Sequence, residues 1–439
     1  FLKSLTQTPV SIEGVETEPK VTTYTYSELG TFEQAHISAY VVKATEEIND
    51  KVSKSFIYVD DTTSNTHGLL STITSVMDGQ TSNIQMSHLY EAGTITTDAV
   101  ITGYDNSTMQ SQSVVSVFTQ RQLQNTDVNQ IVTFQEYDLL GRITKQASAP
   151  DTPEEICRTY EYIYPRGDDN NVWPVMAETD AIGVGRKTFY DGLGRVVSLQ
   201  EQDDDGTSSK SASYSGTYRE VLAKTYDVFG NVVEEKSSDW LWDLSSSSPA
   251  RMAAPQTSTK SYEFDAWGNK YRTIHSDGRI ELEIHDPIEN TVTQGIEGQG
   301  MFKATINAFE QPATVTQINI DETNYCELSY DYDGFGRLIS ESDAAGNLTL
   351  STYDVFDRIV SKTLPDLTVL NTTYADFSNE SLPVSVKVND TALGEMTYDG
   401  LGRAMSDTVG GRTSTYVYEK GGDKPSKVTT PENTQQDLT

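Results

Sequence analysis

One set of potentially reactive side chains recurs along this 439-residue sequence: a tyrosine and an aspartate, then a glycine and an arginine, in the order Tyr-Asp-x-x-Gly-Arg. A phenol, a carboxylate and a guanidinium together could transfer protons or bind an ion. A catalytic group is usually needed once, however, whereas a packing device returns in every unit of a repeat. The recurrence favours a structural role, so we expect no enzyme activity, no catalytic residue, no cofactor site and no metal site.

The motif occurs in five strict copies and two close variants. Their residues are Tyr137, Asp138, Gly141, Arg142, Tyr190, Asp191, Gly194, Arg195, Tyr226, Asp227, Gly230, Asn231, Tyr332, Asp333, Gly336, Arg337, Tyr398, Asp399, Gly402, Arg403, and, in the variants, Phe264, Asp265, Gly268, Asn269, Tyr353, Asp354, Arg358. Two worn copies begin at Ile306 and Tyr374. A pattern with this many fixed positions should rarely arise by chance, so the repeat is a specific signal.

Other candidate sites are weaker. The histidines are scattered, and no two have the i, i+4 spacing of a helical metal site. The acidic run 203–205 could bind Ca²⁺, but it lacks the twelve-residue loop pattern, so a solvated loop is favoured. Cys157 and Cys326 lie far apart without metal-ligand neighbours and are expected to be buried free thiols.

The motif must be positioned by a tight turn between two strands. The aspartate can accept a hydrogen bond from the backbone two residues on, and the glycine can adopt a positive φ. β-rich residues follow each copy, as at 196–198 and 338–340. Each copy is therefore predicted to be a β-hairpin whose turn is Asp-x-x-Gly. The tyrosine should pack against neighbouring repeats, and the arginine should stack on that ring or pair with the aspartate of a neighbour.

The spacing of the copies indicates a unit of roughly 20 residues, which accommodates two short strands and two turns. Earlier copies are further apart because polar inserts such as 203–209 and 245–248 lengthen some turns. An unrecognised copy around Tyr160 and Tyr162 would also fit the first long interval. We predict β-rich strands at 1–126 that lead into a repeat array at 127–439.

Strands are expected before the array as well. Short β-rich runs bounded by Gly, Asn, Asp or Ser lie at 21–26, 37–43, 54–59, 94–103 and 113–119. The nearest helix candidate is the short segment 45–50, and no long segment shows a helical period. The predicted fold class is all-β.

The composition limits the classes of partner. The net charge is −33, from 65 acidic and 32 basic residues. Phosphate binding depends on Lys and Arg, so this balance argues against nucleic acid and against anionic membrane surfaces. No apolar run approaches the length of a transmembrane helix. We expect neither nucleic-acid binding nor membrane insertion, and a solvated acidic surface is favoured over a charge-driven function.

The motif copies resemble the repeats of the rearrangement-hotspot family, also called RHS or YD-repeat proteins. The turn from Asp343 to Asn347 resembles the family's companion Asp-x-x-Gly-Asn turn, and Asp180 to Gly183 is similar to another. The resemblance extends over residues 127–427. Within the family, the segment 118–142 is most similar to the B and C components of bacterial insecticidal toxin complexes, the Tc toxins.

This resemblance implies a large curved sheet that forms part of a hollow spiral shell, or cocoon, around a cytotoxic payload. The implied partners are the remaining RHS shell portion or a partner B or C component, the enclosed toxin domain and a pore-forming component. It also implies a secreted, extracellular virulence protein. C components carry a self-cleaving region with Asp-Pro-x-Gly elements, whereas the one Asp-Pro here, Asp286-Pro287, is followed by Ile and Glu.

Two functions from different classes follow. The first is a non-catalytic, encapsulating shell segment of an RHS-type toxin complex, of either B or C type. The alternative is a YD-repeat module for cell-surface adhesion or recognition, teneurin-like or wall-associated, in which the outer surface binds a receptor or glycan. A toxin domain encoded in the same reading frame would support the first, and a membrane or wall anchor would support the second.

Overall fold

The computed structural model describes residues 2–11, 17–31, 39–164, 173–203, 217–243, 250–251, 254–321, 323–419, 421–432 and 434–437. All regular elements in these ranges are β-strands. The predicted all-β class and the predicted array of hairpins are therefore confirmed. The described strands form a large antiparallel sheet of 34 strands, with β18 (Trp242–Asp243) and β19 (Ala250–Arg251) as a separate pair.

The chain divides into two compact units. The first comprises Phe1–Thr133 and Tyr330–Thr439, and the second comprises Phe134–Ser329. The division does not test the predicted boundary between residues 126 and 127, which stays a prediction.

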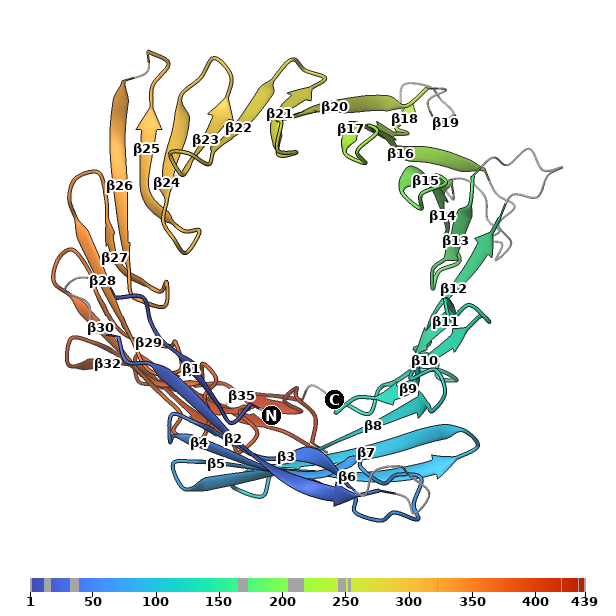
Figure 1. Ribbon diagram of the computed structural model, residues 1–439, viewed down its shortest axis with the longest axis vertical. Coiled ribbons are helices and arrows are strands. Elements are labelled where there is room, and N and C mark those ends of the chain that lie inside the picture. The colour runs from blue at the N-terminus through green and yellow to red at the C-terminus, as the bar shows by residue number, and fades with distance from the viewer. Residues whose placement is uncertain are drawn as a thin grey trace. The chain divides into compact units, whose positions relative to one another are not determined.

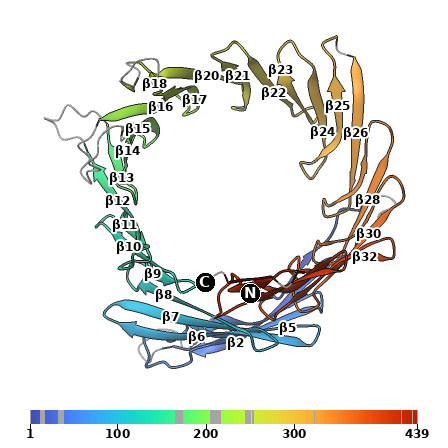
Figure 2. The same ribbon diagram turned by 180° about the vertical axis from the view of Figure 1, so that it is seen from behind.

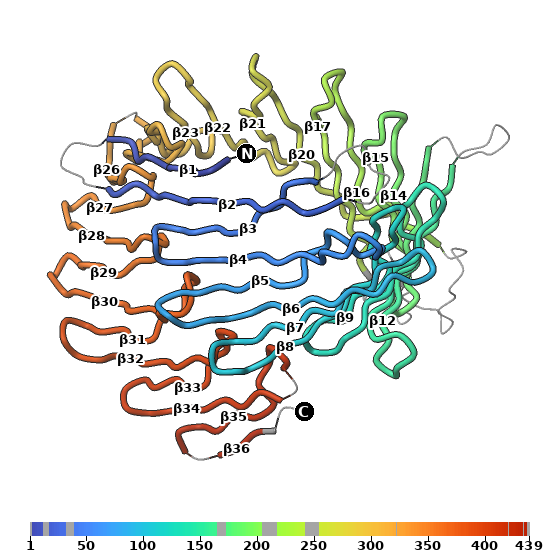
Figure 3. Tube along the Cα trace, turned by 60° about the horizontal axis from the view of Figure 1, so that its bottom comes forward, coloured from blue at the N-terminus to red at the C-terminus, as the bar shows by residue number. Residues whose placement is uncertain are grey.

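The strands of the first unit are β1 (Ser4–Gln7), β2 (Lys20–Gly30), β3 (Ala39–Ile48), β4 (Val52–Tyr58), β5 (Leu70–Met77), β6 (Gln80–Glu91), β7 (Thr94–Thr102), β8 (Thr108–Ser116), β9 (Gln122–Thr126), β26 (Asn324–Tyr332), β27 (Leu338–Ser342), β28 (Leu348–Tyr353), β29 (Ile359–Thr363), β30 (Val369–Tyr374), β31 (Pro383–Val388), β32 (Thr391–Tyr398), β33 (Ala404–Val409), β34 (Arg412–Val417), β35 (Lys427–Thr429) and β36 (Gln435–Asp437), of which β26 begins before the boundary. Figure 3 shows that turns of β2–β8 meet turns of β27–β34 in this unit.

The strands of the second unit are β10 (Val132–Tyr137), β11 (Ile143–Ser148), β12 (Ile156–Ile163), β13 (Val175–Thr179), β14 (Gly185–Tyr190), β15 (Val196–Gln202), β16 (Tyr218–Tyr226), β17 (Val232–Asp239), β20 (Gln256–Phe264), β21 (Lys270–His275), β22 (Ile280–Asp286), β23 (Thr291–Ile296), β24 (Met301–Ile306) and β25 (Pro312–Ile318). Figures 1 and 2 show these strands side by side in a single layer.

Successive strands pair in antiparallel register, so the chain is a long meander. The predicted strands lie within this meander, but the helix candidate at 45–50 is wrong. Its first residues complete β3, and Asn49 and Asp50 form the turn to β4 with φ near 50°. Residues 45–50 contain a single apolar residue, Ile48, so no period can be read from them, and pairing of 45–48 with β2 and β4 decides for the strand.

A register shift recurs at the end of the strand that precedes the motif turn. In the copy at 190–195, Phe189 pairs with Ser198, but Tyr190 pairs with Val196, which leaves one extra residue in the second strand. Similar shifts occur at Tyr226, Phe264, Tyr353, Tyr374 and Tyr398. Such β-bulges increase the local twist and re-aim the neighbouring side chains.

The described part of the chain buries few side chains fully. The buried apolar residues are Leu29, Val52, Ala147, Val175, Ala177 and Ala375. The chain exposes 27199 Å², whereas a compact monomer of 48.5 kDa would expose about 17,000 Å². Contacts between neighbouring hairpins must therefore replace much of the stabilisation that a filled core gives to a globular domain.

Candidate functional site

Each motif copy forms a turn held by its own aspartate. In hairpin β26–β27, the Gly336 N–H donates to the carbonyl oxygen of Asp333 at 2.9 Å and closes the turn. One carboxylate oxygen of Asp333 accepts hydrogen bonds from the N–H groups of Phe335 at 2.9 Å and Arg337 at 3.0 Å. Gly336 has a φ of 78°, a conformation that strains other residues. The aspartate thus satisfies backbone donors that the turn leaves unpaired.

The other copies repeat this geometry. The same pair of backbone hydrogen bonds to an aspartate carboxylate is found at Asp138, Asp191, Asp227, Asp265, Asp354 and Asp399. The worn copy uses the amide oxygen of Asn307 in this role. The companion turns at Asp180 and Asp343 are built alike. A side-chain oxygen at this position is therefore the common requirement.

The motif arginine pairs with the aspartate of its own turn, and Arg337 also pairs at 2.8 Å with Asp357 of the next motif copy, a partner of the kind that the sequence suggested. Arg337 Nε donates to the second carboxylate oxygen of Asp333 at 2.6 Å, and Arg403 Nε contacts Asp399 at 2.7 Å in the same way. The reason is geometric, because the turn folds residue i+4 back over residue i. In the copies that end in asparagine, the Asn231 amide donates to Asp227 at 2.9 Å.

The arginine also reaches the next hairpin. The guanidinium of Arg337 lies 5.0 Å from the ring centroid of Tyr353, and Arg337 Nη1 donates to the carbonyl oxygen of Asp354 at 3.1 Å. The equivalent ring stacks pair Arg142 with Tyr162, Arg195 with Tyr226, Arg358 with Tyr374 and Arg403 with Tyr418, at 4.1 to 4.6 Å. A cation over an aromatic face is favourable, most of all where water is excluded.

The tyrosine hydroxyl completes the contact. Tyr353 donates to the carbonyl oxygen of Leu338, the residue that follows Arg337, at 2.8 Å. Tyr374, Tyr418, Tyr226 and Tyr162 make the corresponding bond to Ile359, Ala404, Val196 and Ile143. We name this unit the Asp–Arg–Tyr clamp: the aspartate and arginine of one turn with the tyrosine of the next hairpin, as in Asp333, Arg337 and Tyr353.

The clamp locates the copy that the sequence left unassigned. Tyr162 occupies the position of the next-hairpin tyrosine, over Arg142 and bonded to Ile143. No Asp-x-x-Gly turn follows it, so the motif alone could not identify it with certainty. In the other clamps the tyrosine follows the motif arginine by 15, 16 or 31 residues, and a tyrosine within this range after Arg142 is the signal that would have located it.

The carboxylates of Asp333 and Asp191 favour their ionised form. Burial by itself would raise the pKa of Asp333, but hydrogen bonds from the side chain and the N–H of Arg337 outweigh this and lower its pKa below the usual value. In Asp191 the backbone hydrogen bond from Arg195 is the main cause of a lowered pKa. The tyrosines shift the other way, since burial raises the pKa of Tyr353 and Tyr418. These groups are tuned to remain a salt bridge and a neutral phenol.

A second set of contacts joins distant parts of the first unit. The Asp105 carboxylate, in the turn between β7 and β8, accepts a 2.9 Å hydrogen bond from the Gly400 N–H, 295 residues later. Tyr104 and Phe377 have ring centroids 4.8 Å apart. We call the line of contacts between the turns of β1–β9 and the motif turns of β26–β34 the seam.

The seam continues at several other turns. The Lys20 ammonium contacts the Asp357 carboxylate at 2.5 Å and lies 4.7 Å from the Phe335 ring centroid. The Val10 N–H donates to the carbonyl oxygen of Gly334 at 2.8 Å. The remaining contacts pair Gln80 with Asp376, and Asn129 with Asp423. The motif gave no indication of the partners from the first part of the chain, because Val10, Lys20, Gln80 and Asn129 do not belong to a motif copy.

Close backbone approach explains a glycine in the seam. A Cβ on Gly400 would lie 2.5 Å from the Asp105 carboxylate oxygen and 2.6 Å from the Tyr104 nitrogen, and one on Gly334 would lie 2.4 Å from the Val10 oxygen. Gly192 holds the same place in its motif copy, but nothing lies within 4 Å of its Cβ position. The glycine after the aspartate is therefore required by neighbours at the seam and by nothing in the second unit.

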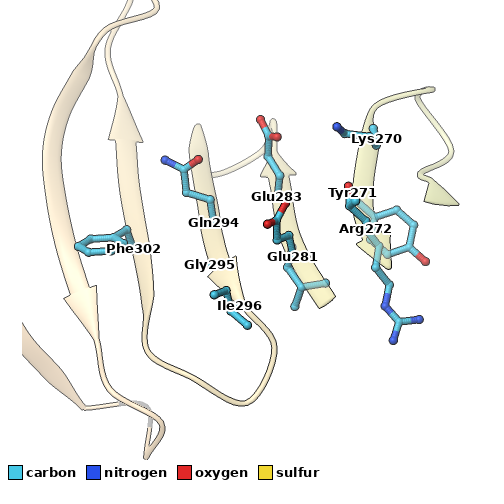
Figure 4. Close-up of a pocket in the computed structure, with 11 residues that line it drawn as sticks. Lys270, Tyr271, Arg272, Glu281, Glu283, Gln294, Gly295, Ile296 and Phe302 are labelled. Atoms are coloured by element: carbon cyan, nitrogen blue, oxygen red, sulfur yellow. The ribbon is translucent and has the colours of Figure 1, made fainter. Parts of the chain in front are cut away.

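A shallow pocket of about 350 Å³ lies over strands β21–β24 of the second unit (Figure 4). Glu283, Gln294 and Phe302 are cross-strand neighbours in its lining. Arg272 pairs with Glu263 at 3.2 Å and with Glu297 at 3.4 Å. Its lining combines the exposed ring of Phe302 with hydrogen-bonding side chains, among them Tyr271, whose hydroxyl donates to Glu263 at 2.7 Å.

The other candidates from the sequence do not come together. His67 contacts the Gly30 carbonyl oxygen, His88 contacts Thr97 and the Leu70 carbonyl oxygen, and His285 contacts Glu283. In the described ranges no group of three His, Cys, Asp or Glu side chains could hold a metal ion. Asp203 pairs with Arg219, while 204–205 and His36 lie outside the described residues.

The cysteines differ from the expectation. Cys157 and Cys326 are free thiols but only half-buried, because strand positions in a sheet with accessible faces exclude water incompletely. No helix in the described part of the chain has the length and apolar character needed to cross a membrane.

The repeated turn and clamp match a known family of repeats. The RHS Repeat family model matches residues 332–369, a stretch that contains the clamp of Asp333, Arg337 and Tyr353. The predicted RHS resemblance is thereby confirmed for this part of the chain. A comparison with curated proteins gives no significant match.

Among solved structures, the chain is similar to the crystal structure of TcdB2-TccC3 without its hypervariable C-terminal region, with 12% identity, 96% of this chain covered and a TM-score of 0.43. A Photorhabdus luminescens Tc holotoxin pore matches with 12% identity, 95% of this chain covered and a TM-score of 0.36. The chain spans about a quarter of the length of these structures, 25% and 27%. At these TM-scores the likeness carries no argument about function. The residues at 332–369 are an RHS repeat.

Proposed function

We propose that this chain is a non-catalytic wall segment of an RHS-type toxin complex that helps to enclose a cytotoxic payload. The Asp–Arg–Tyr clamp is the observation that carries the proposal. In each clamp the carboxylate, guanidinium and phenol, which are the groups that could do chemistry, contact one another and the backbone of two hairpins. Side chains engaged in this way join structural units and are not available to a substrate.

The sheet itself supports an enclosing role. In the second unit the strands form a single layer, and the chain buries few apolar side chains. A wall needs a continuous surface with strong lateral joints, and the clamps supply such a joint at the motif turns that end in arginine. Its partners would be the remaining shell portion or a B or C component, the enclosed toxin domain and a pore-forming component, in a secreted insecticidal virulence complex.

A protection experiment tests this proposal. Two forms of the protein encoded by the complete reading frame are purified and treated with trypsin. One is unmodified, and the other carries Asp333→Asn and Asp399→Asn, which weaken two clamps. We expect a protease-resistant payload fragment in the unmodified protein and faster cleavage of that fragment in the variant. A payload segment cleaved at the same rate in both proteins, or the absence of any protected fragment, would contradict enclosure.

Adhesion remains the second candidate because of the pocket over β21–β24. The Phe302 ring is 46% exposed and lies beside Glu283 and Gln294. An exposed aromatic ring next to hydrogen-bonding side chains can bind the face of a sugar. A glycan array tests this function. Binding that is lost in Phe302→Ala but retained in Phe118→Ala would favour adhesion over enclosure. Phe118 serves as the control because it is an aromatic residue elsewhere in the chain that is 85% exposed.

A further inference from the structure

Turns lie alternately at two ends of the strands because each strand of the meander reverses direction. We call the loops that include the motif turns the first turn row: 138–141, 191–194, 227–230, 265–268 and 287–290 in the second unit, and 333–336, 354–357 and 399–402 in the first. We call the loops at the opposite ends the second turn row: 49–51, 78–79, 103–107 and 127–131 before the array, and 343–346, 364–367 and 410–411 after it.

The seam is a contact between the first turn row and the second. Asp105 of loop 103–107 binds the Gly400 N–H of loop 399–402. At this contact Leu401, the residue that follows Gly400 in the turn, is half-buried. The molecule thus shows what covers a first-row turn, namely the second-row turn of another strand array.

In the second unit the first turn row is not covered. The residues between the aspartate and the glycine are apolar and almost fully exposed: Leu139 (105%), Leu140 (72%), Leu193 (79%), Val228 (93%), Phe229 (88%), Trp267 (69%), and, in the turn 287–290, Ile288 (89%). Isolated exposed apolar residues are ordinary, but a row of them at one edge marks an interaction site. The same positions at the seam, Phe335 and Leu401, are half-buried.

The first unit leaves a second-row edge uncovered as well. Leu367 of loop 364–367 is 79% exposed. Nothing lies within 4 Å of the Cβ positions of Gly346, Gly410 and Gly411. The chain therefore carries, in free form, both kinds of surface that meet at the seam.

We propose that the uncovered first turn row of the second unit docks against the second turn row 343–346, 364–367 and 410–411 of another copy of this chain. The two surfaces differ, so the contact is head to tail, and a pair of copies keeps one free surface of each kind. A second copy fits this surface because the same two types of turn already meet at the seam within one molecule. This inference does not depend on the proposed function.

Net charge sets the conditions for association. Two copies at −33 each repel one another, whereas the docking surfaces are mostly uncharged. Raised salt shortens the Debye length to about 3 Å at 1 M and leaves apolar contacts in place. Association should therefore strengthen with ionic strength, which distinguishes it from a contact built on ion pairs.

Sedimentation velocity of the full chain over a range of concentrations, at low salt and at about 1 M NaCl, tests the proposal. We expect reversible association that grows with salt and weakens at least about tenfold in Val228→Ser/Phe229→Ser, since exposed aromatic anchors carry much of the energy of an interface. The control Ile57→Ser/Leu89→Ser removes apolar residues of 56% and 58% exposure from strand faces and should associate like the unmodified chain.

A mixing experiment tests the head-to-tail geometry. Phe229→Glu removes the first-row surface and Leu367→Glu removes the second-row surface, so each variant alone should be monomeric. Mixed together they can form one junction, and we expect a species no larger than a dimer. A chain that stays monomeric at high salt, an association that Val228→Ser/Phe229→Ser leaves unchanged, or variants that associate alone would overturn the proposal.

Discussion

The hydroxyl of Tyr353 donates a 2.8 Å hydrogen bond to the carbonyl oxygen of Leu338, which lies directly after Arg337 in the sequence. The same side chain carries the Arg337 guanidinium over its ring. Tyr353 thus contacts both the turn and the strand of the preceding hairpin. This double contact recurs along the array and is the means by which hairpins with almost no buried core are joined.

Loss of the charge on Asp333 should weaken its clamp. Asp333→Asn keeps an oxygen for the turn but removes the less exposed of the two carboxylates that pair with Arg337, whose side chain is 17% exposed, and leaves it the Asp357 carboxylate at 2.8 Å. We expect the free energy of unfolding to fall by about 2 kcal/mol in urea titrations. The matched control is Asp343→Asn, in an exposed turn whose partner is the Asn347 amide, where the loss should be smaller. Equal losses at both sites would show that the arginine adds nothing.

Removal of the Tyr353 hydroxyl separates the two halves of the clamp. Tyr353→Phe keeps a ring beneath Arg337 and loses the bond to Leu338, so we expect a loss of about 1 kcal/mol. Native-state hydrogen exchange of the β27 and β28 amide groups measures the local change. Tyr325→Phe, at a tyrosine that is 70% exposed, serves as the control and should leave exchange unaltered. Unchanged exchange in Tyr353→Phe would contradict the role assigned to the hydroxyl.

Acid should destabilise the chain through the turn carboxylates. The pKa of Asp333 is lowered in the folded protein although burial opposes this, because Arg337 donates to it, and the pKa of Asp191 is lowered by its bond with Arg195. A lowered folded pKa contributes stability that is present above the unfolded pKa of about 3.9 and is lost as the pH falls through the folded pKa. Urea midpoints should therefore be flat near neutral pH and fall below about pH 4, less steeply in Asp333→Asn.

Alkali should act through the tyrosines with the opposite sign. Burial raises the pKa of Tyr398 and Tyr190 in the folded state. The resulting stability is fully present below the unfolded pKa of about 10 and is lost as the pH rises through the folded pKa. Urea midpoints should fall above about pH 10, and Tyr398→Phe should reduce that fall relative to its value at pH 7. An identical alkaline slope in the variant would exclude Tyr398 as a contributor.

Two equivalent glycines should respond differently to alanine. In Gly400→Ala the new Cβ meets Asp105 and Tyr104 at less than 3 Å, and we expect a loss of about 1–3 kcal/mol with faster hydrogen exchange in β7 and β8. Gly192→Ala changes the same motif position where the Cβ meets nothing, so the stability of the chain should be nearly unaltered. A similar loss in both variants would place the cause in the turn itself and not in the seam.

The Asp-x-x-Gly turns could be predicted from the sequence, while the particular partners of each arginine could not. An aspartate that accepts from the second and fourth N–H groups along the chain needs only its own neighbours, so a local pattern encodes it. The same holds for the φ of 78° at Gly336. The stack of Arg142 on Tyr162 depends instead on strand pairing across β11 and β12, and so the motif left Tyr162 unassigned.

The sequence by itself determined the all-β class, the hairpin repeat and the identity of the turn residues, because each follows from contacts between residues a few positions apart. Only the tertiary structure decided that Asp105 meets Gly400 and that Lys20 meets Asp357, 295 and 337 residues away. Such contacts depend on the accumulated twist and register of many intervening strands, which a local sequence pattern cannot predict. For the same reason the covered glycines and the uncovered Gly192 look alike in the sequence and differ only in the folded chain.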